Sequence, residues 1–139
     1  MPRATVHVPP WFVHNQGPLL GILSFTGQGA LAAWYIGESV ASERPAYLAQ
    51  GLFAFVGVVL LGSGIVTREW WFLRKGSGVG IAAWIAFALQ LAWPTVFGFT
   101  IHLPLHVYVA VILLGGHSAF QSMFLYEVAG IRMRERESP

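Results

Sequence analysis

Long runs of apolar residues, separated by short polar segments, make up most of the chain. Four such runs cover residues 18–37, 47–66, 78–99 and 104–128, and none of them contains Lys, Arg or Asp. A helix needs roughly 20 mostly apolar residues to cross the hydrocarbon core of a bilayer. Strands of a membrane barrel need only about 10 residues with strict alternation, which these runs do not show. The pattern predicts an all-α integral membrane bundle of four transmembrane helices.

The segments around the runs carry signals that start or end helices. Pro18 is expected in the first turn of a helix, where its missing N–H costs nothing. Residues 38–45 are a polar linker, residues 74–78 a charged turn and residues 101–104 a very short turn, and Gly130 is expected as a C-terminal cap. A short interfacial arm precedes the first run and a short tail follows the last. The whole chain is therefore expected to form one transmembrane domain, without a cleavable signal peptide.

Seven of the eight Lys and Arg residues fall on one side of this four-span topology. With four spans both termini share that side, and the opposite side carries only Arg44. Loops with an excess of Lys and Arg lie in the cytoplasm. We therefore expect cytoplasmic termini in a prokaryotic plasma (inner) membrane, with the cations near anionic lipid headgroups. Trp34, Tyr35 and Tyr47 flank the Arg44 linker, where aromatic rings are expected at the opposite membrane surface.

Composition agrees with a membrane protein and narrows the chemistry. The 139 residues are 55% hydrophobic and only 10% charged, whereas soluble domains carry about 25% charged residues. There is no cysteine, which excludes disulfides, iron–sulfur clusters, thiolate nucleophiles and covalent c-type haem. Neither a serine-hydrolase elbow nor a zinc-protease motif occurs. No enzymatic activity, metal site or nucleic-acid partner is expected.

Polar side chains within the runs are few, and three of them are expected at a similar depth. Gln28, Gln90 and His117 lie near the centres of the first, third and fourth runs. On the fourth run His106, His117 and Gln121 share a helix face, because eleven residues are close to three turns and four residues close to one. These side chains are expected either to form hydrogen bonds between helices or to bind a quinone or haem b.

The positions of the histidines and acids restrict these alternatives. His102, His106 and His117 all belong to the fourth helix or the turn before it, so a haem held by two histidines within this chain is not expected. A haem with one histidine ligand, or one shared with a partner chain, stays open. The only acid in the runs is Glu127, at the inner end, where an ion pair with Arg132 or Arg68 is expected. A proton-coupled transporter is therefore disfavoured.

These features together favour a small, non-catalytic accessory subunit of a larger membrane protein complex. Its short loops and ends leave no room for a soluble catalytic domain, so other transmembrane subunits are the expected partners. An energy-converting respiratory or electron-transfer assembly is the expected setting. Two alternatives remain, namely a quinone- or haem b-binding membrane-anchor subunit for electron transfer, and a small channel or transporter.

Overall fold

The computed structural model describes residues 9–93 and 104–137, and these ranges contain α-helices and no strands. The helices are α1 (Pro10–Ser42), α2 (Pro45–Thr67), α3 (Trp70–Ala92) and α5 (Leu105–Glu137). Each is long and apolar enough to cross a membrane. The prediction of an all-α, multi-pass membrane bundle is thus confirmed for the described part of the chain.

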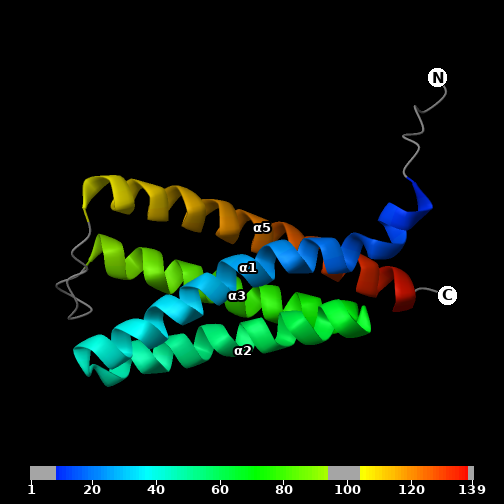
Figure 1. Ribbon diagram of the computed structural model, residues 1–139. Coiled ribbons are helices and arrows are strands. Elements are labelled where there is room, and N and C mark those ends of the chain that lie inside the picture. Colours follow the sequence, from blue (N-terminus) through cyan, green and yellow to red (C-terminus); the bar gives the residue numbers. More distant parts are fainter. Residues whose placement is uncertain (1–8, 94–103, 138–139) are drawn as a thin grey trace.

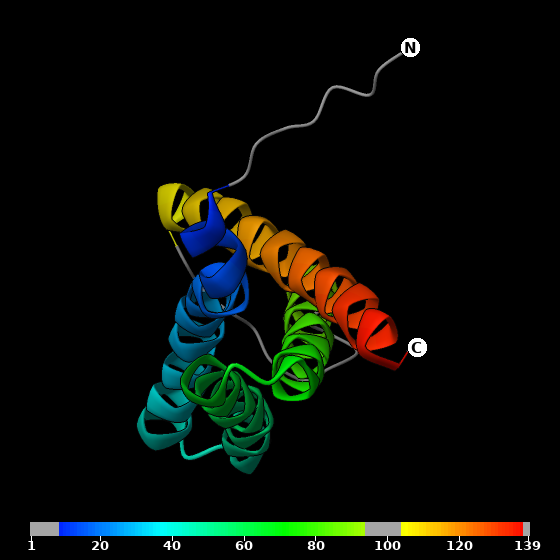
Figure 2. The same ribbon diagram turned by 90° about the vertical axis from the view of Figure 1, so that its right-hand side faces the viewer.

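The four helices run alternately up and down, so that the start of α1 and the end of α5 lie at the same end of the bundle (Figure 1). We call this the terminal end, and it also holds the turn between α2 and α3. Helix α1 packs mainly on α2, α3 packs on both α2 and α5, and α1 also contacts α5. Among the described residues α2 and α5 make no contact, because α5 slants across the far side of α1 and α3 (Figure 2).

Helix α1 begins at Pro10, eight residues before the predicted start at Pro18. Pro10 occupies the first helical turn, where an N–H is not needed. Pro18 instead lies inside the helix and lacks the N–H that would bond to the carbonyl of His14. The first turns of α1, dark blue in Figure 1, lean away from the axis of the rest of the helix. The expected interfacial arm is therefore helical from Pro10 onwards.

Helix α3 begins at Trp70, so the prediction of a charged turn at residues 74–78 is wrong. The chain turns at Arg68 and Glu69 instead, and Arg68 ends α2 with a left-handed backbone (φ 59°). A helix can continue past the hydrocarbon core into the headgroup region, where charged side chains reach water. Gly76 also has a packing role, since a Cβ there would lie 2.8 Å from the Leu61 Cγ of α2.

Helix α5 continues through Gly130 to Glu137, so the predicted cap at Gly130 is also wrong. The residue lies buried within the helix, and a Cβ there would meet the guanidinium of Arg74 at 3.0 Å. Helix α1 continues to Ser42, so the predicted linker at residues 38–45 is mostly helical, whereas α2 starts at Pro45, the proline that ends this linker. The predicted turn at residues 101–104 and the end of the third predicted run fall largely on residues 94–103, which lie outside the described ranges.

The core divides into two groups of buried apolar side chains. The group near the terminal end consists of Leu61, Leu73 and Leu125. The larger group, at the other end, includes Tyr35 and Tyr47, which are only 1% and 5% exposed. Both tyrosines flank the Arg44 linker, and their rings pack within the bundle rather than against lipid. Trp34 contacts both rings edge to face, at centroid distances of 5.1 and 6.2 Å, and Phe87 contacts Tyr35 at 5.9 Å.

Candidate functional site

Gln28 is fully buried on α1, at the place where α1, α2 and α3 meet. Its side-chain Nε2 donates a hydrogen bond to the backbone carbonyl of Gly76 in α3 at 3.1 Å. The amide fits there only because its neighbours are glycines, since a Cβ on Gly57 or Gly80 would overlap the Gln28 side chain. The predicted hydrogen bond between helices is therefore present, but its acceptor is a backbone carbonyl rather than a histidine.

Gln90 is also buried, on α3, and its Oε1 accepts a 2.6 Å hydrogen bond from the Tyr35 hydroxyl of α1. Tyr35 was not among the predicted site residues, because its ring was expected at the membrane surface. Its position seven residues after Gln28, on the same side of α1, was the available signal. Gln90 and Tyr35 thus link α1 to α3 near the aromatic cluster.

The predicted single layer of Gln28, Gln90 and His117 does not form. Tyr35 follows Gln28 by seven residues, which is about 10 Å along a helix, so the Tyr35–Gln90 bond and the Gln28 site involve positions of α1 about two turns apart. Gln28 and His117 do lie at similar depth, because a Cβ on Gly27 would touch Ser118 of α5. They have opposite surroundings, however, since Gln28 is buried and His117 is exposed.

The His117 side chain lies on the face of α5 that the other described helices leave uncovered. Its Nε2 is 3.4 Å from Nε2 of Gln121, one turn further along the same helix. His106 is exposed as well, and eleven residues separate the two histidines by about 16 Å along α5. One haem iron cannot bind both of them. Among the described residues no group of three or more His, Cys, Asp or Glu is placed to hold a metal ion.

Several further polar atoms are buried at the depth of Gln28, and the sequence analysis did not single them out. Ser24 lies one turn before Gln28, and Ser122 lies one turn after Ser118; both are fully buried. Their hydroxyls, and the Oε1 atom of Gln28, have no hydrogen-bond partner among the described residues. Every polar side chain that is buried in the described ranges is uncharged. In the described ranges, the middle of the bundle therefore contains a few buried polar side chains but no buried charge.

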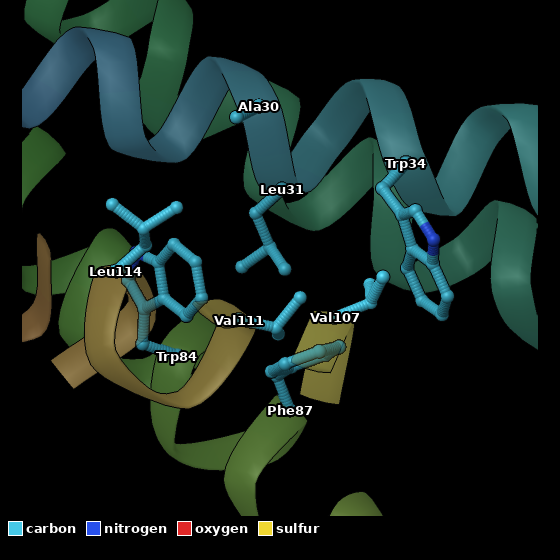
Figure 3. A pocket seen from close by; sticks show the side chains of 8 residues that line it. All are labelled: Ala30, Leu31, Trp34, Trp84, Phe87, Val107, Val111 and Leu114. Atoms are coloured by element: carbon cyan, nitrogen blue, oxygen red, sulfur yellow. The ribbon is translucent and has the colours of Figure 1, made fainter. Parts of the chain in front are cut away.

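An apolar cavity of about 240 Å³ lies between α1, α3 and α5, on the side of the bundle away from α2. Figure 3 shows Leu31 and Val111 facing each other across it, between the indole rings of Trp34 and Trp84. The indole nitrogen of Trp84 is buried and has no partner in the described part of the chain. None of the five predicted site residues lines this cavity, so it is separate from them.

The terminal end of the bundle carries the strongest concentration of charge. Arg68, in the α2–α3 turn, contacts the ring nitrogen Nε2 of His14 and donates a 3.1 Å hydrogen bond to Asn15 Oδ1. Arg136, near the end of α5, forms a 3.3 Å ion pair with Glu69. These contacts connect segments that are more than 50 residues apart in the sequence.

Arg132 and Arg68 contact other residues instead of forming the expected ion pair with Glu127. Arg132 pairs with Glu135 at 3.1 Å and also donates to Gln16 of α1 at 3.1 Å. Arg132 therefore connects the last turns of α5 to the first turns of α1.

No protein-family model matches the chain, and neither a curated protein nor a solved structure matches it.

Proposed function

We propose that the protein is a non-catalytic accessory subunit of a larger integral membrane assembly, and that the uncovered face of α5 binds a neighbouring transmembrane helix. The single observation that carries the proposal is the position of His117 and Gln121. Both are polar, both lie at mid-depth in the bundle, and His117 is directed away from the other described helices.

A polar side chain that faces hydrocarbon is costly, because lipid tails offer no hydrogen-bond partner. The contact between His117 and Gln121 is long, at 3.4 Å, and it leaves most of their donors and acceptors unused. Polar side chains such as His and Gln form hydrogen bonds across helix interfaces in membranes. A helix from another subunit, packed on this face, would supply the missing partners.

The rest of α5 supports the same conclusion. In its most apolar 18-residue stretch only 12% of the residues are buried, against 28% to 33% in the other helices. The uncovered face carries bulky apolar side chains around His117, namely Leu113, Phe120 and Phe124, together with the small residue Gly116. Bulky side chains beside a small residue suit the packing of another helix, because small residues allow two helices to approach each other closely. Helix α5 is therefore the best candidate for contact with another chain.

We propose that the terminal end lies in the cytoplasm, because six of the seven described cations lie at that end. We also propose a prokaryotic plasma membrane as the location of the assembly. An energy-converting, electron-transfer complex is the setting we propose, since such complexes contain small helical subunits without soluble domains. A haem b or quinone held by His117 would lie between α5 and the partner rather than within this bundle. An absorption spectrum of the purified assembly separates that alternative from a purely structural subunit.

Purification in mild detergent tests the proposal. The wild-type chain should bring down other transmembrane proteins in stoichiometric amounts, and His117→Leu should reduce their recovery about fivefold. That factor corresponds to the loss of about 1 kcal/mol, the order of one hydrogen bond between membrane helices.

Thr26→Val serves as the matched control. Thr26 is also polar, exposed and close in depth to His117, but its hydroxyl is already bonded to the Ile22 carbonyl of its own helix at 2.9 Å. Its replacement should leave partner recovery unchanged. A monomer or a homo-oligomer with nothing attached would contradict the accessory-subunit proposal, as would equal losses in the two variants.

A further inference from the structure

A second hollow, different in character from the apolar cavity, opens at the terminal end of the bundle. It has a volume of about 240 Å³ and lies between the first turns of α1, the α2–α3 turn and the end of α5. Its walls include two arginines, a histidine and a tryptophan: Arg68, Arg136, His14 and Trp70. Gly17 and Pro18 of α1 complete the lining. Three segments that are distant in sequence thus bring two cations to one small pocket.

The charge of Arg68 is oriented but not neutralised. Its partners are the ring of His14 and the side-chain oxygen of Asn15, both of which are uncharged when they accept its N–H groups. A guanidinium carries five N–H donors, and these contacts use two of them. Arg68 therefore presents further donors and a full positive charge next to the pocket.

Arg136, the second cation of the pocket, is paired, but only weakly. Its partner Glu69 lies 3.3 Å away, and the two side chains are 62% and 51% exposed. An ion pair in such an exposed position contributes little, because water screens it and both side chains lose freedom in forming it. An incoming anion can therefore compete with Glu69 for Arg136.

The depth of the pocket identifies the kind of anion. Helices α2 and α3 each have 23 residues, or about 34 Å of length, which exceeds the hydrocarbon core of about 30 Å. The turn between them, with Arg68, therefore lies at the level of the lipid headgroups. Trp70 and Trp71 occupy the same level, where indole rings are enriched. The volume is below the roughly 300 to 1,000 Å³ of sites for drug-sized ligands, so it suits a headgroup fragment rather than a whole lipid.

We propose that this pocket binds the phosphate group of an anionic lipid headgroup, with Arg68 and Arg136 as the charged ligands and the His14 ring orienting Arg68. Two guanidinium groups that line one pocket suit the oxygens of a phosphate, which arginine binds through paired N–H donors. The site lies apart from the uncovered face of α5, so it does not depend on the accessory-subunit proposal.

Native mass spectrometry of the full chain in detergent, titrated with phosphatidylglycerol, measures the binding. Arg68→Gln and Arg136→Gln should each weaken phosphatidylglycerol binding about tenfold, as expected for the loss of a charge-assisted hydrogen bond. Glu69→Gln should tighten it severalfold, because it removes the carboxylate that competes for Arg136. Arg136 lies on an exposed final turn, so its variant keeps the test valid if Arg68→Gln fails to fold.

Lys75→Gln is the matched control. Lys75 lies at the same end and carries the same charge, but it faces the Trp71 ring at 5.9 Å and does not line the pocket. Its replacement should change binding less than twofold. Equal losses in Lys75→Gln and Arg68→Gln would show a general surface attraction and overturn the site, as would an unchanged affinity in both arginine variants.

Inorganic phosphate provides the second arm of the experiment, because a free phosphate shares the chemistry of a headgroup. If the ligand is a lipid, millimolar phosphate should leave bound phosphatidylglycerol in place, since the acyl chains hold the headgroup at the site. Displacement at that concentration would overturn the lipid assignment. It would assign the pocket to a soluble phosphate instead.

Discussion

Gln28 occupies the centre of the bundle because two residues on neighbouring helices lack a side chain. The amide lies against Gly57 of α2 and Gly80 of α3, and donates its hydrogen bond to the carbonyl of Gly76. The Gln28 amide can reach this backbone carbonyl only because the glycines beside it have no Cβ to block the approach. The glycines of this chain therefore determine which polar side chain is buried, and not only how closely the helices pack.

Gly80→Ala should destabilise the protein by about 1 to 3 kcal/mol, the range for overpacking a close-packed interior. The new Cβ would overlap the Gln28 amide, so that the hydrogen bond to Gly76 breaks or α1 moves away. Unfolding in a titration with denaturing detergent measures the change. Gly29→Ala, one residue from Gln28, is the control because a Cβ there meets nothing within 4 Å. If both variants unfold alike, the close contact with Gln28 is refuted.

The helices are longer than the apolar runs from which they were predicted. Helix α1 extends from Pro10 to Ser42 and α5 from Leu105 to Glu137, each 33 residues, so both project beyond a core of about 30 Å. Their projecting turns meet at the terminal end, where Arg132 donates to Gln16. The hydrophobic pattern marks where a helix enters and leaves the hydrocarbon, but backbone hydrogen bonds can continue the helix into the headgroup region.

Replacement of Gly130 distinguishes a helix that continues from one that ends. Within a helix, Gly130→Ala should raise the free energy of unfolding by up to about 1 kcal/mol, because alanine favours helix over glycine. The contact with Arg74 is with the far end of a flexible side chain, which can shift. At a left-handed cap the same change would instead lower stability by a similar amount. Circular dichroism and unfolding together give the sign, and a loss of both helicity and stability would place the helix end at Gly130.

Over the whole molecule, charge is distributed along the bundle axis in a strongly asymmetric way. Among the described residues, Arg44 lies at one end, whereas the terminal end holds the other six Lys and Arg residues: Arg68, Arg74, Lys75, Arg132, Arg134 and Arg136. The last turns of α5 pack near α1 and the α2–α3 turn, so that Arg136 and Arg68 line one pocket and Arg132 contacts Gln16 of α1. The predicted orientation in the membrane follows from this asymmetry.

Single cysteines test the orientation directly, since the natural chain contains none. A membrane-impermeant maleimide should label Ala41→Cys, in the last turn of α1, in intact cells. It should label Glu137→Cys, at the terminal end, only after the membrane is opened, because the cation-rich end is expected in the cytoplasm. Both positions are exposed, so burial does not limit the reaction. The reverse labelling pattern would place the terminal end outside the cytoplasm and contradict the predicted topology.

The four long helices of the described ranges, their approximate positions and the gathering of cations at one end could all be predicted from the sequence. These properties are local, because each membrane-crossing helix must satisfy its own backbone hydrogen bonds and match the hydrocarbon thickness with its own residues. The sequence also identified Gln28, Gln90 and His117 as the unusual side chains within the runs.

The surroundings of each of those side chains, in contrast, depend on how the helices pack together. Gln28 and His117 are similar in depth and polarity. Gln28 is enclosed by glycines of two other helices, whereas His117 is exposed on the uncovered face of α5. This difference in burial depends on how each helix is rotated about its axis and on which helices pack beside it. Both are settled by close packing between residues far apart in the chain, which a pattern along one helix does not contain.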